Sequence, residues 1–228
     1  MNVTQNQQKA VSPPSSIREL QARLKKLEGY TIAKLYHELN IPTSAWLKKG
    51  IFGQAIELFL GADAFNEACP DFKALGIELK SLPLDAGGVP KESTFVTSIN
   101  FKAIKQETWQ TSTVYKKLSH VLWLPFEASP NIPFSLRRVA RGFFWQPTQQ
   151  DEAIIAKDWQ ELTELVVLGK LNEISAKLGE VLQIRPKAAN GKSLCAGVDD
   201  RGQVIQTLPR GFYLRRSFTA RLLKDEMG

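Results

Sequence analysis

The sequence contains little cysteine and histidine, with two residues of each among 228. Cys69 and Cys195 are too few and too far apart for a disulfide framework, so a reducing, cytoplasmic compartment is the expectation. His37 and His120 have no cysteine or second histidine at metal-ligand spacing, which argues against a zinc site. A glycine-rich phosphate loop and a nucleophile elbow are also missing. Nucleotide-driven and serine-hydrolase functions are therefore excluded.

Long apolar runs are missing as well. None approaches the length of a membrane span, and residues 1–16 lack the apolar core of a signal peptide. We interpret residues 1–16 as a flexible leader and residues 17–228 as a single domain. Hydrophobic residues make up 43% of the chain, with five tryptophans, which is enough for a folded core. The length of the chain allows one large domain or two lobes that share a cleft. Because long apolar runs are missing, we expect no association with a membrane.

Positive charge is concentrated near the C-terminus. The chain has a formal net charge of +7, and residues 181–224 account for it, because the remainder balances to zero. The basic residues of this segment are Arg185, Lys187, Lys192, Arg201, Arg210, Arg215, Arg216, Arg221 and Lys224. Phe212, Tyr213 and Phe218 lie among them and could reach nucleic-acid bases. This pattern favours a polyanion-binding face over an ordinary solvated surface.

Hydrophobic periodicity predicts a mixed α/β fold. We expect helices at residues 16–27, 31–39, 50–61, 111–118 and 151–168. We expect strands at residues 77–82, 93–99, 121–126, 181–184 and 211–214. The first two strands are predicted to pair as a hairpin across a loop that contains Gly87 and Gly88. The acidic candidates then fall in the first half of the chain and the basic face in the second.

The predicted strand at 77–82 carries the most informative residues. Because successive side chains of a strand point to opposite faces, Glu78 and Lys80 share one face. Asp71 precedes Glu78 by a six-residue gap. Two carboxylates that converge can hold Mg²⁺ through oxygen ligands, and the metal then activates water and neutralises phosphate charge. A neighbouring lysine can orient that water and stabilise the transition state. The pattern suits metal-assisted phosphodiester hydrolysis.

Two readings of these acids remain open from the residues alone. Glu78 and Lys80 could be a solvent-facing pair on a surface strand, and Asp71-Phe72-Lys73 offers a second acid-x-Lys arrangement. Glu57 lies in a predicted helix, 50–61, that is apolar on nearly all sides, which indicates burial. A buried carboxylate needs compensation, so Glu57 is either a satisfied structural acid or a third carboxylate of the same site.

Several longer stretches resemble the PD-(D/E)xK nucleases, and more closely the MutH family of DNA mismatch repair endonucleases. The match extends from about Leu27 to Leu223. Its motifs are Lys49–Gly53 through Glu57, Asp71–Lys80, Val121–Pro125, Gln183–Asn190 and Leu208–Leu214. The resemblance implies a restriction-endonuclease-like fold, with a mixed central sheet flanked by helices and two lobes forming a DNA-binding cleft.

The resemblance also implies an activity and its partners. A member of this family nicks the unmethylated strand of hemimethylated DNA, on the 5′ side of the G in GATC. It does so as a monomer with Mg²⁺, for which Mn²⁺ can substitute. The mismatch repair protein MutL, loaded after MutS finds a mismatch, activates it.

By position, the resemblance assigns catalytic and DNA-contacting roles. The catalytic residues it implies are Asp71, Glu78, Lys80, Glu57 and Lys117, with Asp71 and Glu78 as metal ligands. The DNA-contacting residues it implies are Arg185, Tyr213, Pro186, Phe95 and Lys49. Core packing for Tyr213, a phosphate contact for Arg185 and a solvated position for Lys117 are the simpler alternatives.

Two other functions compete with this one. A GATC restriction endonuclease shares the motif but cuts both strands, which usually requires two active sites. This chain offers one acid cluster, which favours a nicking monomer. A DNA-binding module without catalysis would use the same acids only structurally.

Overall fold

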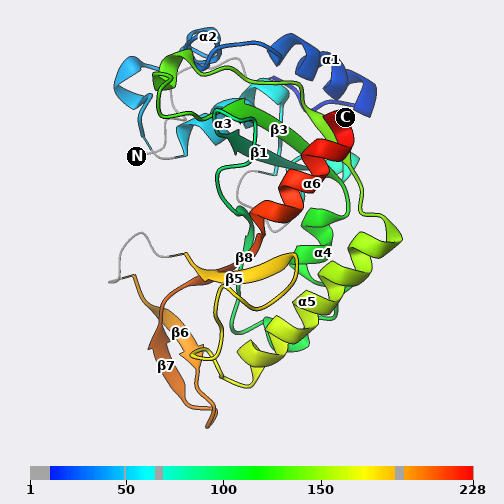
Figure 1. Ribbon diagram of the computed structural model, residues 1–228, viewed down its shortest axis with the longest axis vertical. Helices are drawn as coiled ribbons and strands as arrows, with labels where there is room; N and C mark the ends of the chain where they lie inside the picture. The colour runs from blue at the N-terminus through cyan, green and yellow to red at the C-terminus, as the bar shows by residue number, and fades with distance from the viewer. Residues whose placement is uncertain (1–10, 49, 65–68, 188–192, 228) are drawn as a thin grey trace. The chain divides into compact units, whose positions relative to one another are not determined.

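The structure is a computed structural model that describes residues 11–48, 50–64, 69–187 and 193–227 (Figure 1). Its helices are α1 (Ile17–Leu27), α2 (Ile32–Glu38), α3 (Ile51–Leu60), α4 (Thr113–Leu118), α5 (Gln149–Val167) and α6 (Arg216–Met227). Its strands are β1 (Glu78–Leu84), β2 (Thr94–Ser98), β3 (Val121–Glu127), β4 (Phe143–Trp145), β5 (Leu182–Pro186), β6 (Cys195–Val198), β7 (Val204–Thr207) and β8 (Arg210–Leu214). The predicted mixed α/β class is confirmed. No described helix is both long and apolar enough to cross a membrane.

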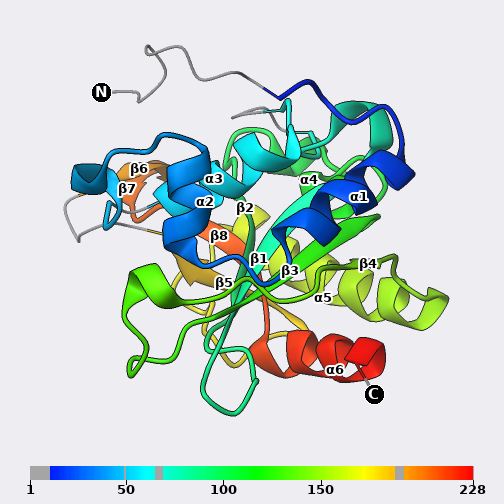
Figure 2. The ribbon, with the colours of Figure 1, turned by 90° about the horizontal axis from the view of Figure 1, so that it is seen from above.

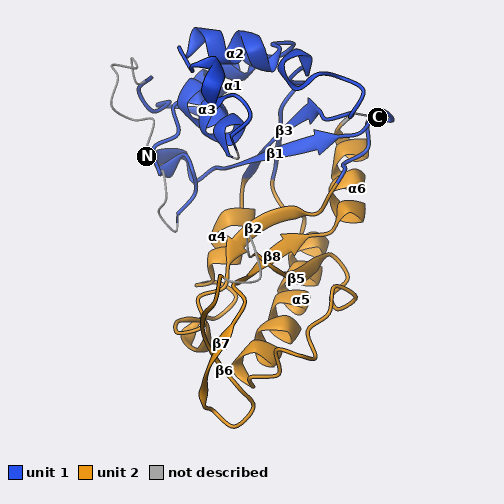
Figure 3. Ribbon diagram, turned by 90° about the vertical axis from the view of Figure 1, so that its left-hand side faces the viewer, with its two compact units in different colours: residues 1–91, 121–145 blue, residues 92–120, 146–228 orange. Residues whose placement is uncertain are grey.

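The chain forms two compact units (Figure 3). The first comprises residues 1–91 and 121–145, and the second comprises residues 92–120 and 146–228. Each unit is therefore assembled from separate stretches of sequence. The single domain expected for residues 17–228, and the leader at 1–16, stay predictions. In residues 11–16, the Ser12 carbonyl accepts a hydrogen bond from Arg23 and Ser16 caps α1.

Unit 1 is built around a three-stranded sheet in the order β1-β3-β4. β1 and β3 run parallel, with Glu78 paired to Val121, and β4 is antiparallel to β3. Val121 to Leu124 are all buried, as expected for a continuous apolar run in a covered strand. Helices α1, α2 and α3 gather on one side of the β1–β3 pair (Figure 2) and share an apolar core that includes Leu20, Leu35 and Ile56.

Unit 2 contains an antiparallel sheet in the order β2-β8-β5 and a separate β6–β7 hairpin. Phe212 and Leu214 of β8 and Ile184 of β5 are buried, and α4 and α5 contact the outer strands. Intervening residues of β8 and β5 point to the opposite face because strand side chains alternate. That opposite face carries Tyr213 and Arg185.

The predicted hairpin between residues 77–82 and 93–99 is wrong. β1 pairs with β3 in unit 1, whereas β2 pairs with β8 in unit 2. The glycine-containing turn does form, because Asp85 accepts hydrogen bonds from the backbone N–H groups of Gly87 and Val89, but it leads only to an isolated bridge between Leu84 and Pro90. A long-range apolar partner thus outweighs the local turn, since burial of a whole strand stabilises more than one turn does.

Candidate active site and nucleic-acid interface

A tight turn between Asp71 and Glu78 reverses the chain and places these two residues beside each other. Phe72 and Ile77 form an antiparallel bridge, with N···O distances of 2.9 and 3.3 Å in the two directions. A single 3-10 turn and Gly76, in the left-handed conformation at φ 65°, close the loop between them. Glycine has no Cβ penalty there. The next residues outward from this bridge are Asp71 and Glu78, so the six-residue gap in the sequence becomes a short distance in space.

Asp71 is anchored to the backbone of β1. Its Oδ2 accepts a hydrogen bond from the Leu79 N–H at 2.8 Å, and its side chain is half-buried. The Asp71 carbonyl also accepts hydrogen bonds from the N–H groups of Asp63 and Ala64. The carboxylate is therefore held next to the strand that carries Glu78 and Lys80.

Glu78 and Lys80 form a buried ion pair in unit 1. Lys80 Nζ lies 2.5 Å from Glu78 Oε1, and Glu78 is only 2% exposed. Both residues come from one face of β1, as the alternation of the sequence predicts. The alternative of a solvent-facing pair is wrong, because a carboxylate this deeply buried needs the lysine to compensate its charge. Charged hydrogen bonds are also stronger in such a shielded environment.

The carboxylate oxygens of Asp71 and Glu78 are of the kind that binds hard divalent cations. The Asp71 carboxylate accepts a hydrogen bond from the Leu79 N–H, and the Glu78 carboxylate accepts one from Lys80. No group of three or more histidine, cysteine, aspartate or glutamate side chains in the described stretches is placed to hold a metal. Two carboxylates suit Mg²⁺, which retains several waters.

Glu57 is less buried than the sequence predicts. It lies on α3 in unit 1 and is half-buried, while Gln54, one turn earlier, is exposed. The helix itself begins and ends at glycines, Gly50 and Gly61, both in the left-handed conformation. The role of Glu57 as a third acid stays a prediction.

Lys117 belongs to unit 2. It lies on α4, which Ser112 caps by accepting a hydrogen bond from Tyr115 N–H at 3.0 Å, and it is half-buried where Lys116 is exposed. Its catalytic role stays a prediction. Burial lowers the pKa of His120, just after this helix, which favours the neutral imidazole at neutral pH.

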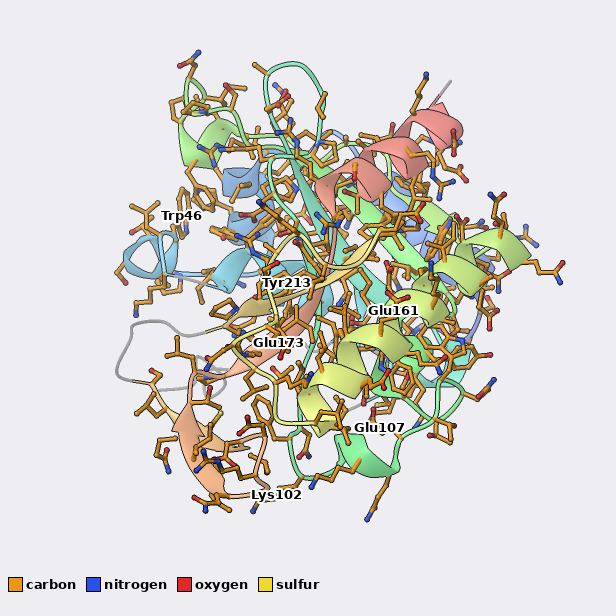
Figure 4. The ribbon with its side chains drawn as sticks, turned by 60° about the horizontal axis from the view of Figure 1, so that its bottom comes forward. Trp46, Lys102, Glu107, Glu161, Glu173 and Tyr213 are labelled. Carbon is orange, nitrogen blue, oxygen red and sulfur yellow. The ribbon has the colours of Figure 1, made fainter. Side chains whose placement is uncertain are left out.

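The open face of the unit 2 sheet carries two packed aromatic rings. Phe95 of β2 is directly opposite Tyr213 of β8, and their rings meet edge to face with centroids 5.3 Å apart. A Cβ at Gly211 would lie 2.8 Å from Phe95 Cε2 and from the Thr97 carbonyl oxygen. Only glycine therefore leaves room for the ring at this point. Figure 4 shows Tyr213, whose side chain is half-buried rather than part of the core.

Arg185 crosses this face from β5. Its guanidinium carbon lies 5.9 Å from the centroid of the Tyr213 ring, and Nη1 donates a hydrogen bond to Ser93 Oγ at 2.6 Å. Burial raises the pKa of Tyr213, opposed by the positive charge of Arg185 and assisted by Glu92. The phenol therefore stays protonated at neutral pH and can donate or accept a hydrogen bond.

Ser98 was missed by the analysis of the sequence, which counted Lys187 only as one of the basic residues of the C-terminal segment. Lys187 Nζ lies 3.7 Å from the Phe95 ring centroid and 3.1 Å from Ser98 Oγ. The period of two along residues 185–187 could have placed Lys187 on the same face as Arg185. Pro186 is exposed between them. The remaining predicted DNA-contacting residue, Lys49, lies outside the described residues.

Some basic residues of the segment 181–224 form contacts within unit 2. Arg215 donates hydrogen bonds to the carbonyl oxygens of Ala176, Leu178 and Gly179. Arg221 forms an ion pair with Asp151 at the start of α5, which joins α6 to α5 (Figure 2). The charge count of the sequence therefore overstates the number of cations that face a polyanion.

Comparison with known proteins decides the family. The family model "DNA mismatch repair enzyme MutH" matches residues 60–158, which include Asp71, Glu78 and Lys80. The MutH protein of Histophilus somni (strain 2336) is 46% identical over 218 residues, covering 95% of this chain and 97% of the relative. This chain belongs to the MutH family.

Other relatives give the same result. The MutH protein of Klebsiella pneumoniae (strain ATCC 700721 / MGH 78578) is 45% identical over 214 residues, covering 93% of each chain. That of Haemophilus influenzae (strain PittEE) is 44% identical over 212 residues, covering 92% of this chain and 95% of the relative. The resemblance predicted from the motifs is confirmed, and the chain is a DNA mismatch repair enzyme of the MutH family.

Proposed function

We propose that this member of the MutH family is a Mg²⁺-dependent endonuclease of methyl-directed mismatch repair. It nicks the unmethylated strand of hemimethylated DNA on the 5′ side of the G in GATC, as a cytoplasmic monomer that MutL activates after MutS has found a mismatch. We include in the proposal a restriction-endonuclease-like fold whose two lobes form the DNA-binding cleft. The observation that supports catalysis most directly is the buried Glu78–Lys80 pair with Asp71 anchored beside it.

In this mechanism Asp71 and Glu78 hold the metal. Bound Mg²⁺, or Mn²⁺ in its place, would supply Lewis-acid chemistry that activates water and neutralises phosphate charge. Lys80 is restrained by its hydrogen bond to Glu78. Its ammonium group is therefore positioned to hydrogen-bond the attacking water and to stabilise the charge that develops on the phosphate. We also propose catalytic roles for Glu57 and Lys117.

The face of unit 2 is proposed to recognise the sequence. A contact between arginine and the edge of a guanine is the commonest specific contact in the major groove. We propose this contact for Arg185, and we propose that Pro186, Phe95 and Lys49 also contact the DNA. The Tyr213 ring would pack against the exocyclic amino group of adenine, where a methyl group changes the contact directly. If Tyr213→Ala cut unmethylated, hemimethylated and fully methylated GATC in the ratios of the unmodified protein, this role for Tyr213 would be refuted.

Cleavage of a circular duplex with a single GATC tests the whole proposal. We expect one nick, in the unmethylated strand of the hemimethylated circle, with Mg²⁺ and not with EDTA, and stimulation by MutL and ATP. Fully methylated circles should stay intact. Cutting of both strands in one binding event would instead support the restriction-endonuclease alternative.

Variants of Asp71 distinguish the proposed endonuclease from a DNA-binding module without catalysis. Asp71→Asn keeps an oxygen that can accept the Leu79 N–H, so it is the matched partner of Asp71→Ala. We expect both variants to lose Mg²⁺-dependent cutting and to keep their affinity for DNA. If the unmodified protein binds DNA but never cuts it, even with MutL and ATP, the acids are structural and the protein is a DNA-binding module.

A further inference from the structure

On the open face of the unit 2 sheet, one hydroxyl group restrains the arginine proposed to read the sequence. Ser93 precedes β2 and Arg185 lies on β5, with β8 between the two strands. Ser93 Oγ accepts a hydrogen bond from Arg185 Nη1 at 2.6 Å, although the two residues are 92 positions apart. The contact therefore spans the whole width of the sheet.

Arg185 would otherwise be a poorly defined side chain. It is exposed, and a free arginine loses rotamer entropy when it is fixed. The register places Gly211 directly opposite Arg185 on β8, so β8 has no side chain at that point, and the Phe95 ring packs there. The Tyr213 ring supports the guanidinium at 5.9 Å. Ser93 and Tyr213 thus hold the group before any DNA is present.

The restraint leaves the donors that recognition needs. A guanidinium has five N–H donors, and the Ser93 hydroxyl accepts from one nitrogen only. The serine is also half-buried in the edge of the sheet, whereas Arg185 is exposed. The hydroxyl group hydrogen-bonds one nitrogen of the exposed guanidinium. This contact orients the guanidinium and leaves its other N–H donors available.

We propose that Ser93 is a positioning residue for sequence recognition, which orients Arg185 for a two-point contact with a guanine edge. This inference rests on the proposed role of Arg185. It adds that the selectivity of Arg185 depends on a hydroxyl group from a distant strand. Ser93 itself touches neither the reacting phosphate nor, in this proposal, the base.

The test measures binding without catalysis, by fluorescence anisotropy in EDTA. The duplexes contain one GATC with guanine or with 7-deazaguanine, which lacks the N7 acceptor, placed in each strand in turn. A duplex without GATC reports non-specific affinity. The proteins are the unmodified chain, Ser93→Ala, Ser93→Thr, Arg185→Ala and, as the control for loss of an exposed hydroxyl, Ser217→Ala.

We expect Ser93→Ala to reduce discrimination between guanine and 7-deazaguanine roughly 2- to 10-fold, as loss of a single hydrogen bond does. Non-specific affinity and thermal midpoint should not change. Ser93→Thr, which keeps the hydroxyl, should restore discrimination, and Ser217→Ala should match the unmodified chain. A purely structural serine would weaken binding to every duplex alike.

Two other outcomes are distinguishable. If Arg185→Ala abolishes discrimination while Ser93→Ala keeps it in full, Ser93 has no positioning role and the proposed function of Arg185 stands. If Arg185→Ala discriminates as well as the unmodified chain, Arg185 does not read guanine, and both the proposed role and the inference from it are overturned.

Discussion

Each charge of the Glu78–Lys80 pair depends on the other, because the carboxylate is 2% exposed. Lys80→Met keeps most of the length of the side chain but removes the cation that is paired with that carboxylate. We expect the free energy of unfolding to fall by about 3 kcal/mol and cutting to be lost. Urea denaturation with a parallel cleavage assay measures both quantities.

A double variant separates the charge from the packing. In Glu78→Gln/Lys80→Met neither charge of this pair remains, so most of the lost stability should return while cutting stays absent. Lys73→Met, an exposed lysine of the second acid-x-Lys arrangement, should change the free energy of unfolding by less than about 0.5 kcal/mol. Equal stability of Lys80→Met and the unmodified chain would contradict the importance of the pair.

Glu107 is a residue whose charge destabilises the fold (Figure 4). Burial raises its pKa above the ordinary 4.5, against the opposing effects of Lys116 and a backbone hydrogen bond from Thr113. A raised pKa means that the protonated form is favoured in the folded chain. Its contribution to stability is therefore complete below pH 4.5 and is lost as the pH rises through the folded-state pKa.

Glu107→Gln should accordingly stabilise the protein at pH 7, because it removes the unfavourable charge, and should have little effect at pH 4. Thermal unfolding at the two pH values measures the difference. Glu173→Gln, at an exposed glutamate, is the control and should show no such pH dependence. An equal shift of the midpoint at both pH values would mean that the charge of Glu107 is not responsible.

For single residues, the sequence predicted those features that depend on neighbours in the chain. The alternation of β1 placed Glu78 and Lys80 on one face, and the structure confirms that they pair. Their depth of burial was not predictable, since it depends on which segments cover the strand. The contact between Ser93 and Arg185 gave no signal, because nothing in a single sequence links positions 92 residues apart.

Among the elements, α5 acts on the strand that carries Arg185. Asp158 of α5 is 3% exposed, and its carboxylate accepts hydrogen bonds from the backbone N–H groups of Glu180, Val181 and Leu182 at 2.7 to 2.8 Å. These residues lead into β5. One helix side chain therefore fixes where the strand begins.

Asp158→Asn should destabilise the protein by about 2–4 kcal/mol, because its amide NH₂ must then face a backbone N–H donor in a buried site. We also expect weaker binding to GATC, since β5 carries Arg185. Urea denaturation and anisotropy measure the two effects. Glu161→Gln on the same helix (Figure 4), with its side chain 60% exposed, should leave both unchanged. Normal stability of Asp158→Asn would contradict this account.

Helices with strong local signals were predictable, and pairings between distant strands were not. Ser16 and Thr31 mark the starts of α1 and α2, and the expected 151–168 helix differs from α5 by only a few residues. α6 was missed, because its sequence reads first as a basic segment. The false hairpin arose from a real turn at Asp85, whose flanking strands each find a partner far along the chain.

For the whole molecule, composition indicated a polyanion-binding protein but not how the cations are used. The nine basic residues of 181–224 include Arg215 and Arg221, which hold unit 2 together through backbone carbonyls and Asp151. The two units are each discontinuous in sequence, with the chain passing between them after residues 91, 120 and 145. No local pattern predicts such an arrangement, because it depends on which strands pair at long range.

The salt dependence of DNA binding measures how many cations of the whole molecule meet phosphates. Each neutralised phosphate contributes about −0.9 to the slope of log affinity against log salt concentration. If Arg185 reads a base, Arg185→Ala should collapse the ratio of GATC to non-GATC affinity and leave the slope on non-GATC DNA unchanged. If Arg185 instead contacts a phosphate, the slope should become shallower by about 1 on every sequence.

Anisotropy titrations at several salt concentrations, in EDTA, distinguish the two cases. Arg18→Ala, an exposed arginine of α1 outside the basic segment, is the control and should change neither the slope nor the ratio. Because Arg215 and Arg221 are engaged within unit 2, we also expect the slope of the unmodified chain to correspond to fewer than the nine cations of residues 181–224. A slope that corresponds to nine or more cations would contradict this expectation.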